Sequence, residues 1–354
     1  MLSSVLWIAL GLVLLVVGAE LLVRGASRLA MRFGISPLVV GLTVVAFGTS
    51  APELAVSLDA ASRGSAAIAV GNVLGSNVFN VLAVLGLSAL CAPLVVHRRI
   101  VQIDAPLVLA ATLAAWALAA DGRLVRWEGA LLFAGVVAYT HFQVRAGRAE
   151  SAAEPEPVER PSGNRARDVV LVLAGLGLLV LGARWLVAGA SDVARTLGLS
   201  ELVIGLTIVA GGTSLPELAT SVIAALRGQR DIAVGNVIGS NVFNLLCVLG
   251  GSALLAPAPI EIPVQALAFD FPVTAAVALA CLPVLFSGHT ITRWEGALFV
   301  AYYVVYTAWL VLAARGSTAL PGLATAVTWF ALPFTAATLV VGSWRWWRRP
   351  RAQR

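Results

Sequence analysis

Two acidic residues stand out because each lies in an apolar segment with no basic residue within nine positions on either side. They are Glu53, in the stretch GTSAPE at 48–53, and Glu217, in the stretch GTSLPE at 212–217. A carboxylate buried in apolar surroundings is costly unless it is protonated or paired with a positive charge. Because the neighbouring sequence offers no such partner, the two acids indicate a site that holds cations or protons.

The residues around each acid add neutral oxygen atoms. Hydroxyl groups precede each Pro–Glu pair, at Thr49, Ser50, Thr213 and Ser214. Each proline removes a backbone N–H group and disrupts the helix before it. Irregular backbone at membrane depth is tolerated where it lines a cavity. We therefore expect freed carbonyl groups to face such a cavity at Ala46, Thr49, Ala210 and Thr213.

A second polar motif follows each acid, GNVLGSNVFN at 71–80 and GNVIGSNVFN at 235–244. Residues four apart share a helix face, which groups Ser76 with Asn80 and Ser240 with Asn244. Hard cations take oxygen ligands, and Ca²⁺ accepts about six to eight of them. Two carboxylates balance the charge of one Ca²⁺, whereas neutral hydroxyl and carbonyl oxygens suit Na⁺.

These motifs occur twice at a constant offset of 164 residues. Segment 41–58 matches 205–222 at 13 of 18 positions, and 69–90 matches 233–254 at 18 of 22. The stretch 18–27 also matches 182–191 at this offset. Small insertions shift two further matches, Asp104-Ala-Pro106 with Asp270-Phe-Pro272 at an offset of 166 and 126–130 with 293–297 at 167. Agreement at one long offset predicts two structurally equivalent units that together cover nearly all of residues 5–314.

The composition places these units in a membrane. The chain is 59% hydrophobic and 12% charged, and its mean hydropathy is +0.92. Apolar runs of roughly 20 residues, long enough to cross a bilayer, recur throughout. We predict spanning helices at 5–30, 36–62, 67–91, 101–120, 126–145, 168–194, 200–226, 231–256, 265–286, 294–314 and 321–344.

Ten of these helices form two sets of five, and an odd number of helices inverts the second set relative to the first. The predicted fold class is therefore an all-α polytopic membrane protein with two inverted five-helix repeats and an extra C-terminal spanning helix. The predicted divisions are a first repeat at 1–145 (motif 41–90), a linker at 146–167, a second repeat at 168–315 (motif 205–254), and an extra helix with a basic tail at 316–354.

Arginine placement predicts the orientation. All 24 basic residues are arginines, and an outside N-terminus puts 18 of them on the cytoplasmic side, as the positive-inside rule favours. The linker and the C-terminal tail are then cytoplasmic, in what we expect to be a bacterial inner membrane. Arginines at segment ends indicate topology rather than nucleic-acid binding. No obligatory protein partner is evident.

The remaining ionisable residues are expected to serve structure. Glu20 is predicted to pair with Arg24, one helical turn later. Four acids fall at predicted helix starts, where they would cap backbone N–H groups: Asp104, Asp168, Glu201 and Asp231. The three histidines lie near segment ends, and the three cysteines show no metal-binding spacing. No cofactor is expected.

The two motif pairs resemble the α-repeats of the cation/calcium antiporter superfamily, and most of all its prokaryotic sodium/calcium exchanger branch. This resemblance implies a ten-helix fold in which helices 2, 3, 7 and 8 enclose four cation sites. One site would take Ca²⁺ and the flanking sites Na⁺. Access would alternate through sliding of helices 1 and 6 against the core.

The resemblance also implies roles for individual residues. Glu53 and Glu217 would be shared carboxylates, and the carbonyl groups of Thr49 and Thr213 would bind Ca²⁺. One sodium site would comprise Ala46, Thr49, Ser50, Ser76 and Glu217, and its mirror image Ala210, Thr213, Ser214, Ser240 and Glu53. Asn80 and Asn244 would line the centre. Potassium-dependent relatives carry Asp at the position of Asn244, so Asn argues against potassium coupling.

The leading functional hypothesis is Na⁺/Ca²⁺ exchange by alternating access. Proton/Ca²⁺ exchange on the same scaffold is the alternative, because two carboxylates can carry two protons as readily as one Ca²⁺. Protons, however, have no need of the repeated hydroxyl groups. An embedded hydrolase is disfavoured because Ser50 and Glu53 have no histidine or lysine nearby in the sequence. The chain is therefore not expected to be an enzyme.

Overall fold

The computed structural model describes residues 2–153, 164–198, 204–286, 289–317 and 319–327, together with positions 336 and 340. Most of the predicted eleventh helix at 321–344 and the basic tail lie outside the described residues, as does the middle of the predicted linker.

The described chain is almost entirely helical. The first repeat contains α1 (Leu2–Phe33), α2 (Pro37–Val40), η1 (Gly41–Val45), α3 (Ala46–Thr49), α4 (Ala51–Ser62), α5 (Ala66–Phe79), η2 (Asn80–Leu85), α6 (Gly86–Cys91), β1 (Leu94–Val95), η3 (Ile100–Asp104), α7 (Ala105–Leu118), η4 (Ala119–Asp121), β2 (Arg123–Leu124) and α8 (Arg126–Ala153). The second contains α9 (Arg165–Thr196), η5 (Gly205–Val209), α11 (Ala210–Gly212), α12 (Leu215–Leu226), α13 (Arg230–Phe243), η6 (Asn244–Leu249), α14 (Gly250–Leu255), β3 (Ile260–Glu261), η7 (Ala266–Asp270), α15 (Phe271–Phe286), β4 (Thr290–Ile291) and α16 (Arg293–Ala314). The short helix α17 (Leu320–Ala326) follows.

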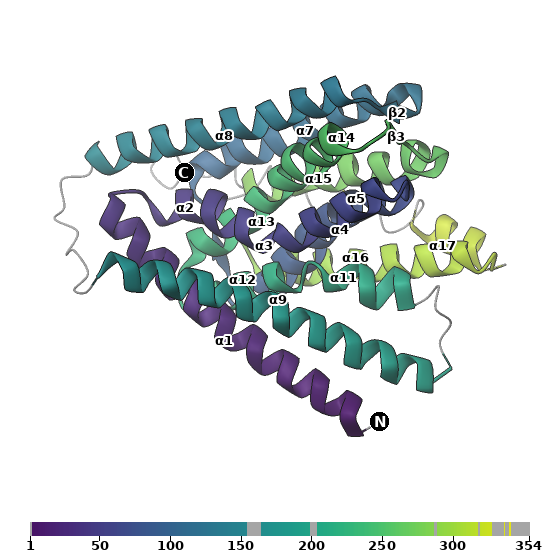
Figure 1. Cartoon of the computed structure of the whole chain (residues 1–354), viewed down its shortest axis with the longest axis horizontal. Helices are drawn as coiled ribbons and strands as arrows, with labels where there is room; N and C mark the ends of the chain where they lie inside the picture. The colour runs from purple at the N-terminus through teal and green to yellow at the C-terminus, as the bar shows by residue number, and fades with distance from the viewer. Residues whose placement is uncertain are drawn as a thin grey trace.

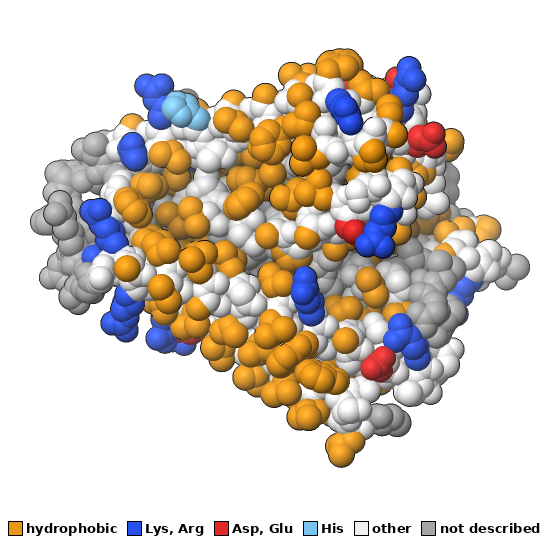
Figure 2. Space-filling model, in the orientation of Figure 1, with side chains coloured by type: hydrophobic (Ala, Val, Ile, Leu, Met, Phe, Trp, Pro, Cys, Tyr) orange, Lys and Arg blue, Asp and Glu red, His pale blue; other side chains and the backbone are white. Residues whose placement is uncertain are grey.

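Many of these elements are long enough to cross a membrane. Within the described residues, seven helices are sufficiently long and apolar, and the bent pair Pro37–Thr49 and Ala51–Ser62 makes an eighth. The shorter apolar helix Leu215–Leu226 is the equivalent of α4, the second half of that bent pair. Figure 2 shows hydrophobic side chains over much of the visible face. An all-α polytopic membrane protein is therefore confirmed.

The inverted repeat extends to irregularities of the helices. Three π-helical segments of the first repeat, η1, η2 and η3, recur at equivalent positions as η5, η6 and η7. Two short antiparallel ribbons join the repeats, β1 with β4 and β2 with β3. The β2–β3 ribbon lies at one end of the bundle in Figure 1, opposite the end at which α8 finishes. Each ribbon is the image of the other, as an inverted repeat requires.

We use two names for the ends of the bundle. The N-terminal side holds the start of α1 and the β2–β3 ribbon, and the linker side holds the end of α1 and the start of α9 (Figure 1). The helices α1 and α9 cross from one side to the other as an antiparallel pair along one flank of the bundle.

Glycines at seven-residue spacing allow α1 and α9 to approach closely. They are Gly11, Gly18 and Gly25 on α1, and Gly175, Gly182 and Gly189 on α9. A Cβ atom at Gly175 would lie 2.7 Å from the backbone nitrogen of Leu22 and 2.8 Å from the carbonyl oxygen of Gly18. Small residues at such interfaces let helix backbones pack in a membrane, where the hydrophobic effect does not drive helices together.

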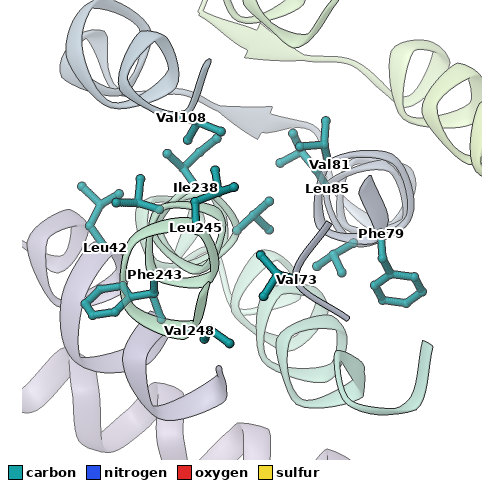
Figure 3. Packing of buried hydrophobic residues seen from close by; sticks show 14 of the residues in the cluster. Leu42, Val73, Phe79, Val81, Leu85, Val108, Ile238, Phe243, Leu245 and Val248 are labelled. Atoms are coloured by element: carbon teal, nitrogen blue, oxygen red, sulfur yellow. The ribbon is translucent and has the colours of Figure 1, made fainter. Parts of the chain in front are cut away.

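The centre of the bundle consists of α5 and α13 with the π-helical segments that continue them. Figure 3 shows their apolar side chains packed together, among them Val73, Val81, Ile238 and Leu245. The most apolar stretch of Arg230–Leu255 is completely buried, whereas that of α1 is mostly exposed. The polar motifs at 71–80 and 235–244 therefore lie on the innermost helices.

Both broken helices interrupt next to the acids, as the sequence predicted. The first break falls at Ser50, where α3 ends and α4 begins at an angle of 43°. The second falls at Ser214, before α12. One expectation was wrong: the carbonyl of Ala46 is not freed, because it accepts a hydrogen bond from the backbone N–H of Ser50 at 3.0 Å. The breaks themselves fall directly before each proline, and the π-helical segments η1 and η5 lie a few residues earlier in the same broken helices.

The acids predicted to be structural have mixed outcomes. Glu20 accepts a hydrogen bond from Arg24 at 2.5 Å, which confirms the local pair. Asp104 caps no helix: its carboxylate accepts hydrogen bonds from Gln143 and Tyr139 of α8. Asp168 forms ion pairs with Arg28 and Arg32 of α1. Asp231 lies in the first turn of α13, and Glu201 falls outside the described residues. Asp104 therefore accepts hydrogen bonds from another helix and makes no capping bond to the backbone of its own.

The close glycine packing predicts a position-specific cost for an added methyl group. Gly175→Ala should destabilise the protein by about 1–3 kcal/mol, the usual range for overpacking. Gly177→Ala is the matched control, because a Cβ at Gly177 meets nothing within 4 Å. Thermal unfolding of both purified variants measures the difference. Equal melting temperatures would show that the close approach of α1 and α9 is not needed for stability.

Candidate cation site

The two predicted acids lie across from each other in a reciprocal arrangement. The hydroxyl of Ser50, from the break before Glu53, donates to Oε1 of Glu217 at 3.1 Å. The hydroxyl of Ser214, from the break before Glu217, donates to Oε1 of Glu53 at 2.7 Å. Both carboxylates are completely buried. Each broken helix therefore supplies a carboxylate to the centre and a hydroxyl group that orients the carboxylate of the other repeat.

Two asparagines hold the broken helices against the central helices. Asn72 of α5 donates to the carbonyl oxygen of Glu53 at 3.1 Å and to the hydroxyl of Ser57 at 2.9 Å. Asn236 of α13 makes the equivalent bonds to Glu217 and Ser221. The site residues proposed from the sequence did not include these asparagines. Their recurrence at matching positions of the two polar motifs was the available signal.

The same asparagines reach the threonines of the opposite repeat. The hydroxyl of Thr49 donates to Oδ1 of Asn236 at 3.0 Å, and that of Thr213 to Oδ1 of Asn72 at 3.4 Å. Each threonine hydroxyl is thereby turned toward an asparagine. The asparagines thus connect the backbone of one acid with the break before the other.

The remaining predicted side chains surround the acids. Oγ of Ser76 lies 3.1 Å from Oγ of Ser214, and Asn244 donates to Asn77 at 3.3 Å. Ser76, Ser240, Asn80 and Asn244 are all buried. Ala46 is buried, whereas its counterpart Ala210 is exposed. Residues from both broken helices and both central helices therefore meet in one region.

Several oxygen atoms in this region are buried without a hydrogen-bond partner among the described residues. They are Oε2 of Glu53, Oε2 of Glu217, Oδ1 of Asn80, Oδ1 of Asn244 and Oγ of Ser240. Buried polar atoms are rarely left unsatisfied, and such exceptions call for an explanation. Carboxylate and amide oxygens accept and do not donate, so a bound cation is the partner that the chemistry of these oxygens favours.

Softer metals have no comparable set of ligands among the described residues. Within the part of the chain that the structure describes, no group of three or more His, Cys, Asp and Glu side chains could hold a metal ion. The arrangement around Glu53 and Glu217 instead combines two carboxylates with hydroxyl and amide oxygens. This set suits hard cations that accept neutral oxygen ligands.

A cavity reaches this region from the N-terminal side. Its volume is about 450 Å³, and its lining runs from Ile68 and Gln265 to Ser76 and Thr213. The glycines of α5 leave it open, because a Cβ at Gly71 or Gly75 would meet nothing within 4 Å. The cavity gives one side of the bundle access to residues beside the acids.

The equivalent route from the linker side is closed by packing. Gly235 and Gly239 of α13 are the counterparts of Gly71 and Gly75, yet both are buried. A Cβ at Gly239 would lie 2.6 Å from the carbonyl oxygen of Leu42, and one at Gly235 would lie 3.0 Å from that of Leu38. The two repeats share a sequence pattern but differ in how closely the broken helix approaches its central partner.

The repeat, at an offset of 166 residues here, also pairs an acid in the cavity with one in the closed half. Asp270 lines the cavity. Its counterpart Asp104 is completely buried and accepts from Gln143, which in turn accepts from Arg99. The position equivalent to Arg99 is occupied by Gln265, which also lines the cavity. The open route thus has an acid where the closed half has a buried network containing an arginine.

Comparisons with known proteins agree with this architecture. The sequence matches the family described as sodium/calcium exchanger protein over residues 3–145 and 168–312. It is 33% identical over 335 residues to the sodium/calcium exchanger MaX1 of Methanosarcina acetivorans, covering 84% of this chain and 95% of that protein. It is 40% identical over 268 residues to the inner membrane protein YrbG of Escherichia coli, covering 74% and 82%.

A solved structure is similar over the same extent. The sodium-calcium exchanger NCX_Mj, soaked with 10 mM Na⁺ and no Ca²⁺, matches with a TM-score of 0.75 and 33% sequence identity. The match covers 87% of this chain and 98% of that one. The likeness therefore includes both five-helix units rather than a single motif.

The one-sided cavity predicts a difference between two equivalent positions. Val209 is 47% exposed and lines the cavity, whereas its counterpart Val45 is completely buried. In protein lacking Cys91, Cys247 and Cys281, a membrane-impermeant maleimide added from the N-terminal side should modify V209C and leave V45C unmodified. Equal modification of both cysteines from that side would contradict the one-sided access.

Proposed function

The chain belongs to the sodium/calcium exchanger family, and from this membership we propose that it exchanges Na⁺ for Ca²⁺ across a membrane by alternating access. The family is one of ion exchangers, so this function is transport rather than enzymatic catalysis. The ions are substrates of the protein.

One observation carries the proposal: two completely buried carboxylates face each other's serines while their second oxygens remain without partners among the described residues. A charged acid in the middle of a membrane costs about 3 kcal/mol or more on insertion scales. A bound cation removes that cost. The two negative charges match one Ca²⁺, and the same oxygens can be shared by Na⁺ ions when Ca²⁺ leaves.

The proposed ligands follow the two-fold relation of the repeats. Glu53 and Glu217 bind Ca²⁺ together with the backbone carbonyls of Thr49 and Thr213. The proposed sodium sites flank that position, one containing Ser50 and Ser76, with Ala46 and Glu217, and the other Ser214 and Ser240, with Ala210 and Glu53. Asn80 and Asn244 line the centre, and the amide at Asn244 leaves it without a third carboxylate for potassium coupling.

Exchange follows from competition for shared oxygens. Because both kinds of ion use the two carboxylates, binding of Na⁺ displaces Ca²⁺. An inverted repeat can exchange the conformations of its halves, which moves access from one side of the membrane to the other. One half of the protein has the open cavity, and the other has Gly235 and Gly239 packed against the broken helix. These are the two conformations that the halves would exchange.

The proposed orientation places the linker side in the cytoplasm. Arginines cluster at that side, which the positive-inside rule assigns to the cytoplasm. The cavity then opens to the outside, and the membrane is the inner membrane of a bacterium. This assignment fixes the direction from which ions reach the site in the conformation described.

Ion gradients distinguish sodium coupling from the alternative, proton coupling on the same scaffold. In proteoliposomes, an outward Na⁺ gradient should drive ⁴⁵Ca²⁺ uptake, and a proton uncoupler should leave that uptake unchanged. The hydroxyl and carbonyl oxygens beside the acids favour this result because protons do not need them. Uptake that ignores Na⁺ and collapses with the pH gradient would establish proton/Ca²⁺ exchange instead.

Removing either central charge should stop transport without unfolding the protein. Glu53→Gln or Glu217→Gln leaves one negative charge against two positive ones, while an amide is cheaper to bury than a carboxylate. We expect Na⁺-driven ⁴⁵Ca²⁺ uptake to fall to the level of empty liposomes with the melting temperature retained. Glu261→Gln, at an exposed position on β3, is the matched control. Normal uptake by either central variant would refute the proposed ligand set.

A further inference from the structure

One ion pair ties the α1–α9 pair to the core on the linker side. Arg227, directly after α12, donates from Nε to Oε2 of Glu20 at 2.9 Å, and its second nitrogen lies 2.9 Å from Oε1. Two parallel contacts of this kind make a geometrically specific arginine–carboxylate pair. The side chain of Glu20 is only 19% exposed. The pair therefore joins a helix of the outer flank to one of the two broken helices.

The repeat gives this pair a counterpart with a different charge. At the offset of 164, Glu20 corresponds to Arg184 of α9, and Arg227 corresponds to Arg63, directly after α4. The backbone supports this alignment, because the glycines that follow, Gly64 and Gly228, have nearly equal positive φ angles of 72° and 74°. A glutamate–arginine pair on the linker side thus corresponds to two arginines on the N-terminal side.

The charge difference matters when the two halves exchange conformations. In the conformation described, α1 is bound to the end of α12 and the linker side is closed. In the opposite conformation, α9 would take the same position relative to the end of α4, bringing Arg184 toward Arg63. Like charges repel, and among the described residues Arg63 is paired only with the exposed Asp59, at 2.9 Å. One conformation is stabilised by an ion pair and the other opposed by repulsion.

We propose that Glu20 and Arg227, with Arg184 and Arg63 opposite them, form a charge latch that favours the conformation open to the N-terminal side. This inference rests on the proposed alternating access. The latch acts through helix position and touches none of the proposed ion ligands. Because the pair is partly exposed, we expect it to shift the two populations by roughly two- to fivefold.

Substitutions on the two sides should shift the access equilibrium in the same direction. Glu20→Gln breaks the existing pair, and Arg184→Glu creates an equivalent pair with Arg63. Both should speed modification of V45C from the linker side and slow that of V209C from the N-terminal side, roughly two- to fivefold. The full-length protein in liposomes is the sample, with a membrane-impermeant maleimide as the probe.

Paired variants supply the controls. The effect of Glu20→Gln should vanish when Arg227 is already Gln, and that of Arg184→Glu when Arg63 is already Gln, since each acts through its partner. Unchanged labelling rates in Glu20→Gln, which is close to isosteric, would overturn the latch, as would an Arg184→Glu effect that persists without Arg63. A wild-type protein without Na⁺-driven Ca²⁺ uptake would contradict the proposed function instead, and the labelling ratio would still report on the latch.

Discussion

The structure depends on a constraint of charge: two carboxylates lie at the centre of a membrane-embedded bundle, where no basic side chain of the described residues pairs with them. Glu53 and Glu217 are completely buried, and each is bonded by the serine of the opposite repeat. Such charges are tolerable only with protons or cations beside them. The broken helices, the asparagine contacts and the cavity all serve to place these two groups and give ions a route to them.

Much of this could be predicted from the sequence because it depends on local patterns. The spans follow from apolar length, the breaks at Ser50 and Ser214 follow from the prolines after them, and the inverted repeat follows from an odd number of helices. The acids were identifiable by contrast with their apolar neighbours. The predicted extra helix falls largely outside the described residues, so its existence stays a prediction.

Other features depend on tertiary contacts that local patterns do not encode. Asp104 was interpreted as a helix cap, but Gln143 and Tyr139 reach it from α8. Asn72 and Asn236 belong to the repeated motif, yet only the packing of α5 and α13 shows that they hold the broken helices. The one-sided cavity was also beyond the sequence, because the glycines that line it and those that close the other side occupy matching positions.

Small residues and polar residues have complementary roles around the two central charges. Glycines permit the two kinds of close contact, between α1 and α9 and between α13 and η1, and the oxygens beside the acids provide the ion ligands. Its central claim is that the buried carboxylates bind the transported Ca²⁺. Equilibrium binding of ⁴⁵Ca²⁺ to the purified protein tests this claim most directly. The account predicts one Ca²⁺ per chain, displaced by Na⁺, and no binding when Glu53 and Glu217 are both replaced by Gln in a protein that remains folded. Undiminished binding by that double variant would contradict it.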